Sequence, residues 1–91
     1  MPKKTANYNQ DGINKLPNDK PVLYRIKTQS GNTNYAGVAK KGRVSERINE
    51  HLGEIPGAKV QIEQFSSIKD AQKKEAGVIK QNKPKYNEQG T

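Results

Sequence analysis

One acidic side chain lies where the surrounding pattern predicts an apolar one. Ile68, Val78 and Ile79 mark the apolar face of a predicted helix. At 100° per residue, Glu75 falls inside this arc rather than beside it. An ionised carboxylate on a buried stripe costs free energy unless a cation, a metal ion or hydrogen-bond donors meet it. Taken alone, Glu75 is explained more simply as an edge residue that reaches solvent or pairs with a lysine.

Two tyrosines and an arginine are predicted to gather around the same small sheet. Tyr24 shares a strand face with Val22 and Ile26, so its ring is expected to point inward. Tyr35 lies on the neighbouring strand, and Arg47 lies one residue from the core stripe of the first helix. Each residue alone is typical of packing or of a solvated surface. The set of two tyrosines, an arginine and Glu75 around one small sheet is less easily explained by packing and solvation, and it favours a functional role for Glu75.

The elements that must position these side chains follow from the periodicity of the chain. Strands are predicted at residues 22–27, 34–39 and 59–65, and helices at 43–52 and from 68 to about 81. The second helix begins with a motif similar to a capping box, Ser67-Ile68-Lys69-Asp70. The order is ββαβα, so we expect an α+β fold with a small three-stranded antiparallel sheet flanked by helices.

The first twenty residues differ in composition from the rest. Residues 1–20 contain few apolar side chains, and four lysines and two aspartates give them a net charge of +2. We expect them to form a flexible basic arm, with residues 21–91 as the folded domain.

Composition narrows the classes of function. The chain has 91 residues and a net charge of +8, which favours a polyanionic partner, nucleic acid first. The absence of cysteine excludes disulfides and thiolate zinc sites, and a single histidine, His51, excludes a multi-histidine metal site. No apolar run approaches the length of a membrane span, and no helix combines a broad apolar face with a basic one, as a membrane-surface helix does. We therefore expect a cytoplasmic protein.

In their order along the chain, these residues resemble the GIY-YIG nuclease superfamily. Val22-Leu23-Tyr24 is similar to its first tripeptide and Tyr35-Ala36-Gly37 to its second, with Val22 in place of Gly and Ala36 in place of Ile. The matching features continue with Gly37-Val38-Ala39-Lys40, with Arg47 and His51 in an Arg-x-x-x-His helix, with Glu75, and with a terminal segment, residues 83–87, that contains Asn87. The resemblance covers residues 21 to about 88. It implies that residues 21–91 form a GIY-YIG-like catalytic domain.

The resemblance implies an endonuclease that depends on a divalent metal and hydrolyses DNA phosphodiester bonds. Glu75 would hold one Mg²⁺ or Mn²⁺, Tyr24 would accept a proton from water, and Arg47 would clamp the phosphate. Tyr35 would orient water or phosphate, and His51 would orient the arginine or shuttle a proton. The expected substrate contacts are Lys40, Lys41, Arg43 and Asn87.

Other functions remain open at this point. A degenerate domain that binds nucleic acid without cutting it is the main alternative, and a small basic assembly protein is a second. A carboxylate in a basic cleft favours hydrolysis, because it repels phosphate unless a metal ion intervenes. Sequence specificity would have to come from loops, from a homodimer or from an accessory subunit.

Overall fold

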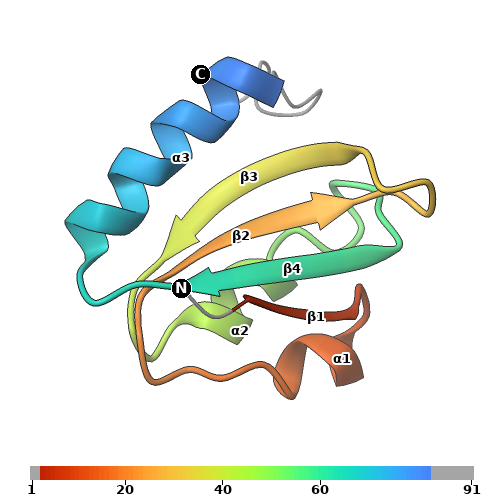
Figure 1. The fold of residues 1–91 in the computed structure, drawn as a ribbon. Coiled ribbons are helices and arrows are strands. Elements are labelled where there is room, and N and C mark those ends of the chain that lie inside the picture. The colour runs from red at the N-terminus through yellow and green to blue at the C-terminus, as the bar shows by residue number, and fades with distance from the viewer. Residues whose placement is uncertain (1–2, 83–91) are drawn as a thin grey trace.

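The computed structural model of the chain describes residues 3–82. Its elements are β1 (Lys3–Asn7), α1 (Gln10–Asn14), β2 (Val22–Lys27), β3 (Thr33–Ala39), α2 (Val44–Asn49), β4 (Lys59–Gln64) and α3 (Ile68–Asn82). The four strands form one antiparallel sheet in the order β1-β4-β2-β3. Helix α3 lies on one face of this sheet, and α1 and α2 lie on the other (Figure 1). The fold class is therefore α+β, as predicted.

The alternation of side chains along each strand builds two separate cores. Val22, Tyr24 and Ile26 of β2 pack toward α1 and α2, whereas Leu23 packs toward α3 with Ala71 and Val78. The three strands predicted from periodicity are confirmed, as is the helix predicted from residue 68. At its start, the backbone N–H of Asp70 donates to Ser67 Oγ at 3.2 Å, which is one half of the expected capping box.

The helix predicted at residues 43–52 is shorter than expected. Helix α2 ends at Asn49, and the backbone N–H groups of His51 and Leu52 donate to carbonyls three residues back, at 3.0 and 3.1 Å. This tighter winding replaces the last helical turn. It ends at Gly53, whose positive φ of 87° suits glycine.

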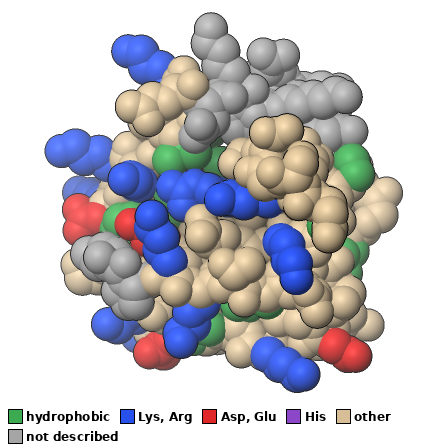
Figure 2. All heavy atoms as spheres, turned by 45° about the vertical axis from the view of Figure 1, so that its right-hand side comes forward, with side chains coloured by type: hydrophobic (Ala, Val, Ile, Leu, Met, Phe, Trp, Pro, Cys, Tyr) green, Lys and Arg blue, Asp and Glu red, His purple; other side chains and the backbone are tan. Residues whose placement is uncertain are grey.

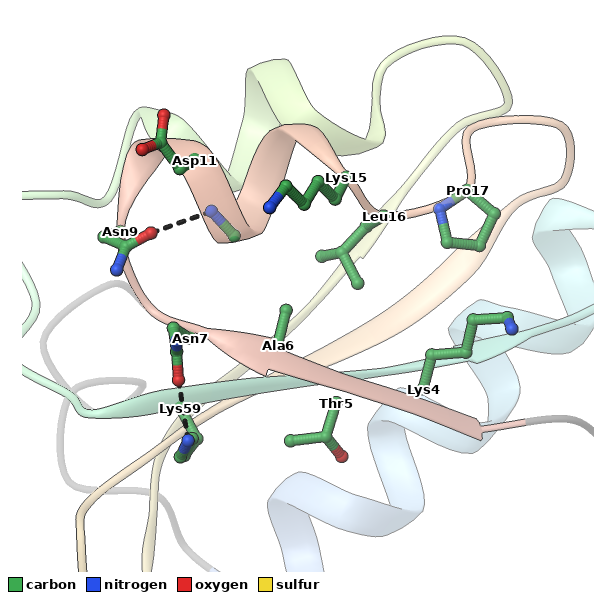
Figure 3. Close-up of a pocket in the computed structure, with 11 residues that line it drawn as sticks. Lys4, Thr5, Ala6, Asn7, Asn9, Asp11, Lys15, Leu16, Pro17 and Lys59 are labelled. Atoms are coloured by element: carbon green, nitrogen blue, oxygen red, sulfur yellow. Dashed lines mark hydrogen bonds between the residues drawn. The ribbon is translucent and has the colours of Figure 1, made fainter.

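The expectation of a flexible arm is wrong for residues 3–20, and the sheet has four strands rather than three. Strand β1 pairs with β4 from Lys3↔Glu63 to Asn7↔Lys59, and the Ile13 side chain of α1 is fully buried. Figure 3 shows Leu16, just after α1, pointing toward Ala6 of β1. The segment escaped prediction because β1 joins the sheet through backbone hydrogen bonds, which a polar sequence makes as well as an apolar one.

The N-terminal segment also holds α2 in place. Asn18 Oδ1 accepts a hydrogen bond of 2.8 Å from the Val44 backbone N–H, and so caps a helix whose own N-cap residue supplies no side-chain bond. The Tyr8 hydroxyl lies 2.8 Å from the carbonyl oxygens of both His51 and Ile55, and its single proton is shared between these two acceptors. Burial raises the pKa of Tyr8 to about 12, so this donor keeps its proton at neutral pH. Residues 3–20 therefore help to position α2 and the turn after it.

Candidate active site

Tyr24 lies at the centre of the candidate site, in the middle of β2. Its side chain has no exposed surface. The Tyr24 ring has room because the residue of β3 that lies against it is Gly37, which has no side chain. A Cβ atom at Gly37 would lie 2.7 Å from Tyr24 Oη and 2.8 Å from Tyr24 Cζ. Gly37 has no positive φ, so the requirement for glycine is one of space.

An imidazole and a second phenol surround the Tyr24 hydroxyl. Tyr24 Oη lies 2.8 Å from Nε2 of His51, in the turn that follows α2. The Tyr35 ring lies 4.6 Å from the His51 ring and 6.1 Å from the Tyr24 ring, between centroids. The two strands and the α2 turn thus bring Tyr24, Tyr35 and His51 together. The direct Tyr24–His51 contact was not anticipated from the sequence.

The surroundings keep both members of this pair uncharged. Burial, and after it the neighbouring Tyr35, raise the pKa of Tyr24, so its phenol stays protonated at neutral pH. Burial and then the Arg47 charge lower the pKa of His51, so the neutral imidazole prevails. A neutral imidazole carries one acceptor nitrogen. The Tyr24 hydroxyl can therefore donate to Nε2 of His51. A hydrogen bond with the Tyr35 side chain also contributes to the raised pKa of Tyr24.

The Glu75 carboxylate does not reach bulk solvent freely. The residue is partly buried on α3, and burial raises the pKa of its carboxyl. It has no ion-pair partner within the described part of the chain. Glu75 raises the pKa of Tyr24 and Arg47 lowers it, so both charges lie within electrostatic range of the same phenol.

A basic pocket of about 340 Å³ lies next to this cluster, where α2 and α3 flank the edge strand β3. Lys40, Arg43 and Arg47 line it together with Gln72 of α3. Arg47 is about half exposed, and its Nη1 lies 3.7 Å from the Glu50 carboxylate. Lys41 is exposed and does not line this pocket. The pocket therefore brings together two of the four expected substrate contacts, Lys40 and Arg43, with Arg47, the expected phosphate clamp.

Asn87 lies outside the described residues. A larger pocket, of about 570 Å³, lies between β1 and α1 (Figure 3), but its charged side chains are all exposed and neither Tyr24 nor Tyr35 lines it. The sequence did not point to Tyr8 or Asn18, whose contacts with the α2 region form across a long separation in the chain.

Comparisons with known proteins place this geometry in context. No protein-family profile matches the chain, and no curated protein sequence matches it significantly. Among solved structures, it is similar to the GIY-YIG N-terminal endonuclease domain of UvrC from Thermotoga maritima, a structure with its catalytic magnesium ion bound. The two share 26% sequence identity and superpose with a TM-score of 0.64 over 81% of this chain and 93% of the other. The chain therefore has a GIY-YIG-like fold, which confirms the resemblance drawn from the sequence.

Proposed function

We propose that the chain is a divalent-metal-dependent endonuclease of the GIY-YIG type that hydrolyses DNA phosphodiester bonds. The observation that carries the proposal is the buried Tyr24 hydroxyl, which lies 2.8 Å from Nε2 of His51 and within electrostatic range of both Arg47 and Glu75. The similar UvrC domain is itself an endonuclease domain, which supports the same class of reaction here.

The residues fit one hydrated metal ion. Glu75 is a partly buried carboxylate whose ionised form is disfavoured by its surroundings, and a divalent cation would compensate that charge. No group of three or more potential ligands occurs among His, Cys, Asp and Glu in residues 3–82. Mg²⁺ keeps most of its waters and often uses one or two carboxylates with substrate phosphate, so a single glutamate suffices. When bound, the ion would act as a Lewis acid and stabilise charge on the phosphate and the leaving oxygen.

Proton transfer falls to Tyr24 and His51. A free phenol is a poor base at neutral pH, and burial makes an isolated phenolate still less favourable here. A relay avoids the phenolate: the Tyr24 oxygen takes a proton from the attacking water while its own proton passes to Nε2 of His51. Because Tyr24 is fully buried, the side chains that cover its hydroxyl must move for water to reach it.

Phosphate binding falls to the basic pocket. Arg47 presents planar donors to the phosphate oxygens and stabilises the charge that develops in the transition state. Its contact with Glu50 is long and exposed, so releasing it costs little. Lys40 and Arg43 would hold the adjoining backbone.

Plasmid cleavage tests this function. The wild type with Mg²⁺ or Mn²⁺ should nick or linearise supercoiled plasmid, and Glu75→Ala should bind DNA but not cut it. Asp11→Asn is the control, because it removes a carboxylate on α1 instead. Equal cleavage by the wild type and Glu75→Ala would refute the role of Glu75. Salt-dependent binding without cleavage by the wild type would favour the degenerate DNA-binding module instead.

A further inference from the structure

Helix α3 has a second flank, which faces away from the candidate active site. Gln72 of α3 lines the pocket beside Arg47, whereas Lys73 and Lys74 line a separate groove on the other side of the helix. The floor of this groove is Arg25 of β2, and its volume is about 430 Å³. We call it the β2–α3 groove. Within residues 3–82, α3 packs mainly on β3 and β2 (Figure 1), and the groove lies along the side of the helix over β2.

Arg25 is an unusual residue to find at the bottom of a groove. Alternation along β2 predicts an outward, solvated side chain, yet its exposed fraction is only 9%. Its Nη1 lies 3.7 Å from Glu63 Oε1 and 3.5 Å from Gln61 Oε1, both at or beyond the limit of a good hydrogen bond. Glu63 Oε1 is buried and has no hydrogen-bond partner within the described residues. The ion pair is therefore loosely made on both sides.

The guanidinium keeps most of its donors unused. It has five N–H groups, and Nη1 is its only nitrogen with a hydrogen bond or ion pair within residues 3–82. A buried cation with unmet donors is costly, so this arrangement favours a ligand that brings acceptor oxygens and negative charge.

The lining of the groove selects an anion. Three basic residues, Arg25, Lys73 and Lys74, line it with one acidic residue, Asp70. Lys3 of β1 is exposed and is paired in register with Glu63 of β4, the residue beside Arg25. It therefore adds a basic side chain close to the groove. Lys and Arg also outnumber Asp and Glu on the face of the molecule drawn in Figure 2.

We propose that the β2–α3 groove binds a backbone phosphate of nucleic acid, as an anchoring site separate from the active site. The Arg25 guanidinium would bind two phosphate oxygens through its free donors, and Lys73 and Lys74 would add point charges. A strand that crosses α3 would then be held on both sides of the helix. The choice of nucleic acid as the ligand rests on the proposed function.

DNA-binding affinity measured against salt concentration tests the groove. The double variant Lys73→Gln/Lys74→Gln should bind a fluorescent oligonucleotide more weakly in EDTA, and its log–log salt slope should fall by about 1 to 2. The matched control is Lys69→Gln/Lys80→Gln, which removes the same charge from exposed positions of α3 that do not line the groove. The control should keep nearly the wild-type slope. Equal losses in both double variants would mean that net charge alone matters, and would overturn the proposal.

The NMR signal of the Arg25 Nε–H group separates this site from the nuclease activity. It should shift when a short oligonucleotide is titrated into the wild type, and shift less in Lys73→Gln/Lys74→Gln. In cleavage assays the same variant should raise KM and leave kcat unchanged. Oligonucleotide binding with an unmoved Arg25 signal would overturn the groove and leave the nuclease standing. A shifted Arg25 signal without any cleavage would overturn the proposed nuclease function and leave the binding site in the groove standing.

Discussion

The close approach of β3 to Tyr24 leads to a prediction about Gly37. A Cβ atom at this position would meet Tyr24 Oη at 2.7 Å, Tyr24 Cζ at 2.8 Å and Tyr35 Cε2 at 3.0 Å. Two of these atoms belong to Tyr24, which has no exposed surface into which its ring could move. Gly37→Ala should therefore force the strand and the ring apart.

The size of the effect follows from overpacking. Extra methyl groups in a packed core cost about 1–3 kcal/mol. In a domain of this size each kcal/mol lowers Tm by about 4–8 °C, so Gly37→Ala should melt at least about 4 °C below the wild type. Circular dichroism at 222 nm during thermal unfolding measures the shift.

Gly77 on α3 provides the matched control. A Cβ atom there meets nothing within 4 Å, and alanine in a helix interior is more favourable than glycine by about 0.5–1 kcal/mol. Gly77→Ala should therefore raise Tm. A Gly37→Ala protein as stable as the wild type would refute the packing described around Tyr24.

Three other predictions concern single side chains. Burial raises the folded-state pKa of Glu75, so the fold loses stability as the pH rises through that pKa and the carboxyl ionises. Glu75→Gln cannot ionise and should therefore have a higher Tm than the wild type at neutral pH in EDTA. An unchanged or lower Tm would contradict this. Burial lowers the folded-state pKa of His51, so the unfolded chain binds the proton first, and the free energy of unfolding should fall as the pH drops below about 6.5. Urea titrations should show a smaller fall in His51→Gln, and an equal fall would count against the assignment. Tyr8→Phe removes a donor from the Ile55 carbonyl, whereas the His51 carbonyl keeps the backbone N–H groups of Glu54 and Ile55, so the variant should lose about 0.5–1.5 kcal/mol of unfolding free energy. A wild-type urea midpoint would disprove this.

Periodicity predicted the central part of the fold because its signals are local. Strand β4 alternates apolar and polar residues, β2 alternates from Tyr24 onward, and β3 is a short run of small and apolar residues after a turn. The phase of α3 placed Glu75 within the apolar arc, and the residue is partly buried. The N-terminal elements gave no comparable signal. Strand β1 is polar, and α1 has only five residues, too few to display a helical period.

The side chains that the sequence misplaced are those whose surroundings come from distant parts of the chain. Alternation along β2 places Arg25 on the face opposite Tyr24, but only the packing of α3 over that face shows that Arg25 is buried. His51 was expected on a continuous helical stripe with Arg47, but α2 ends before it, and the turn brings its imidazole to Tyr24. Such contacts depend on tertiary packing, which residue spacing does not encode.

The central claim is that Glu75 brings a metal ion to the Tyr24–His51 pair. Titration with Mn²⁺, followed by NMR, tests it directly, because paramagnetic broadening falls steeply with distance from the ion. The account predicts that side-chain signals of Tyr24 and His51 broaden at low Mn²⁺ in the wild type and stay sharp in Glu75→Ala. Broadening centred on Asp11 or Asp70, or the same broadening of Tyr24 and His51 without Glu75, would contradict it.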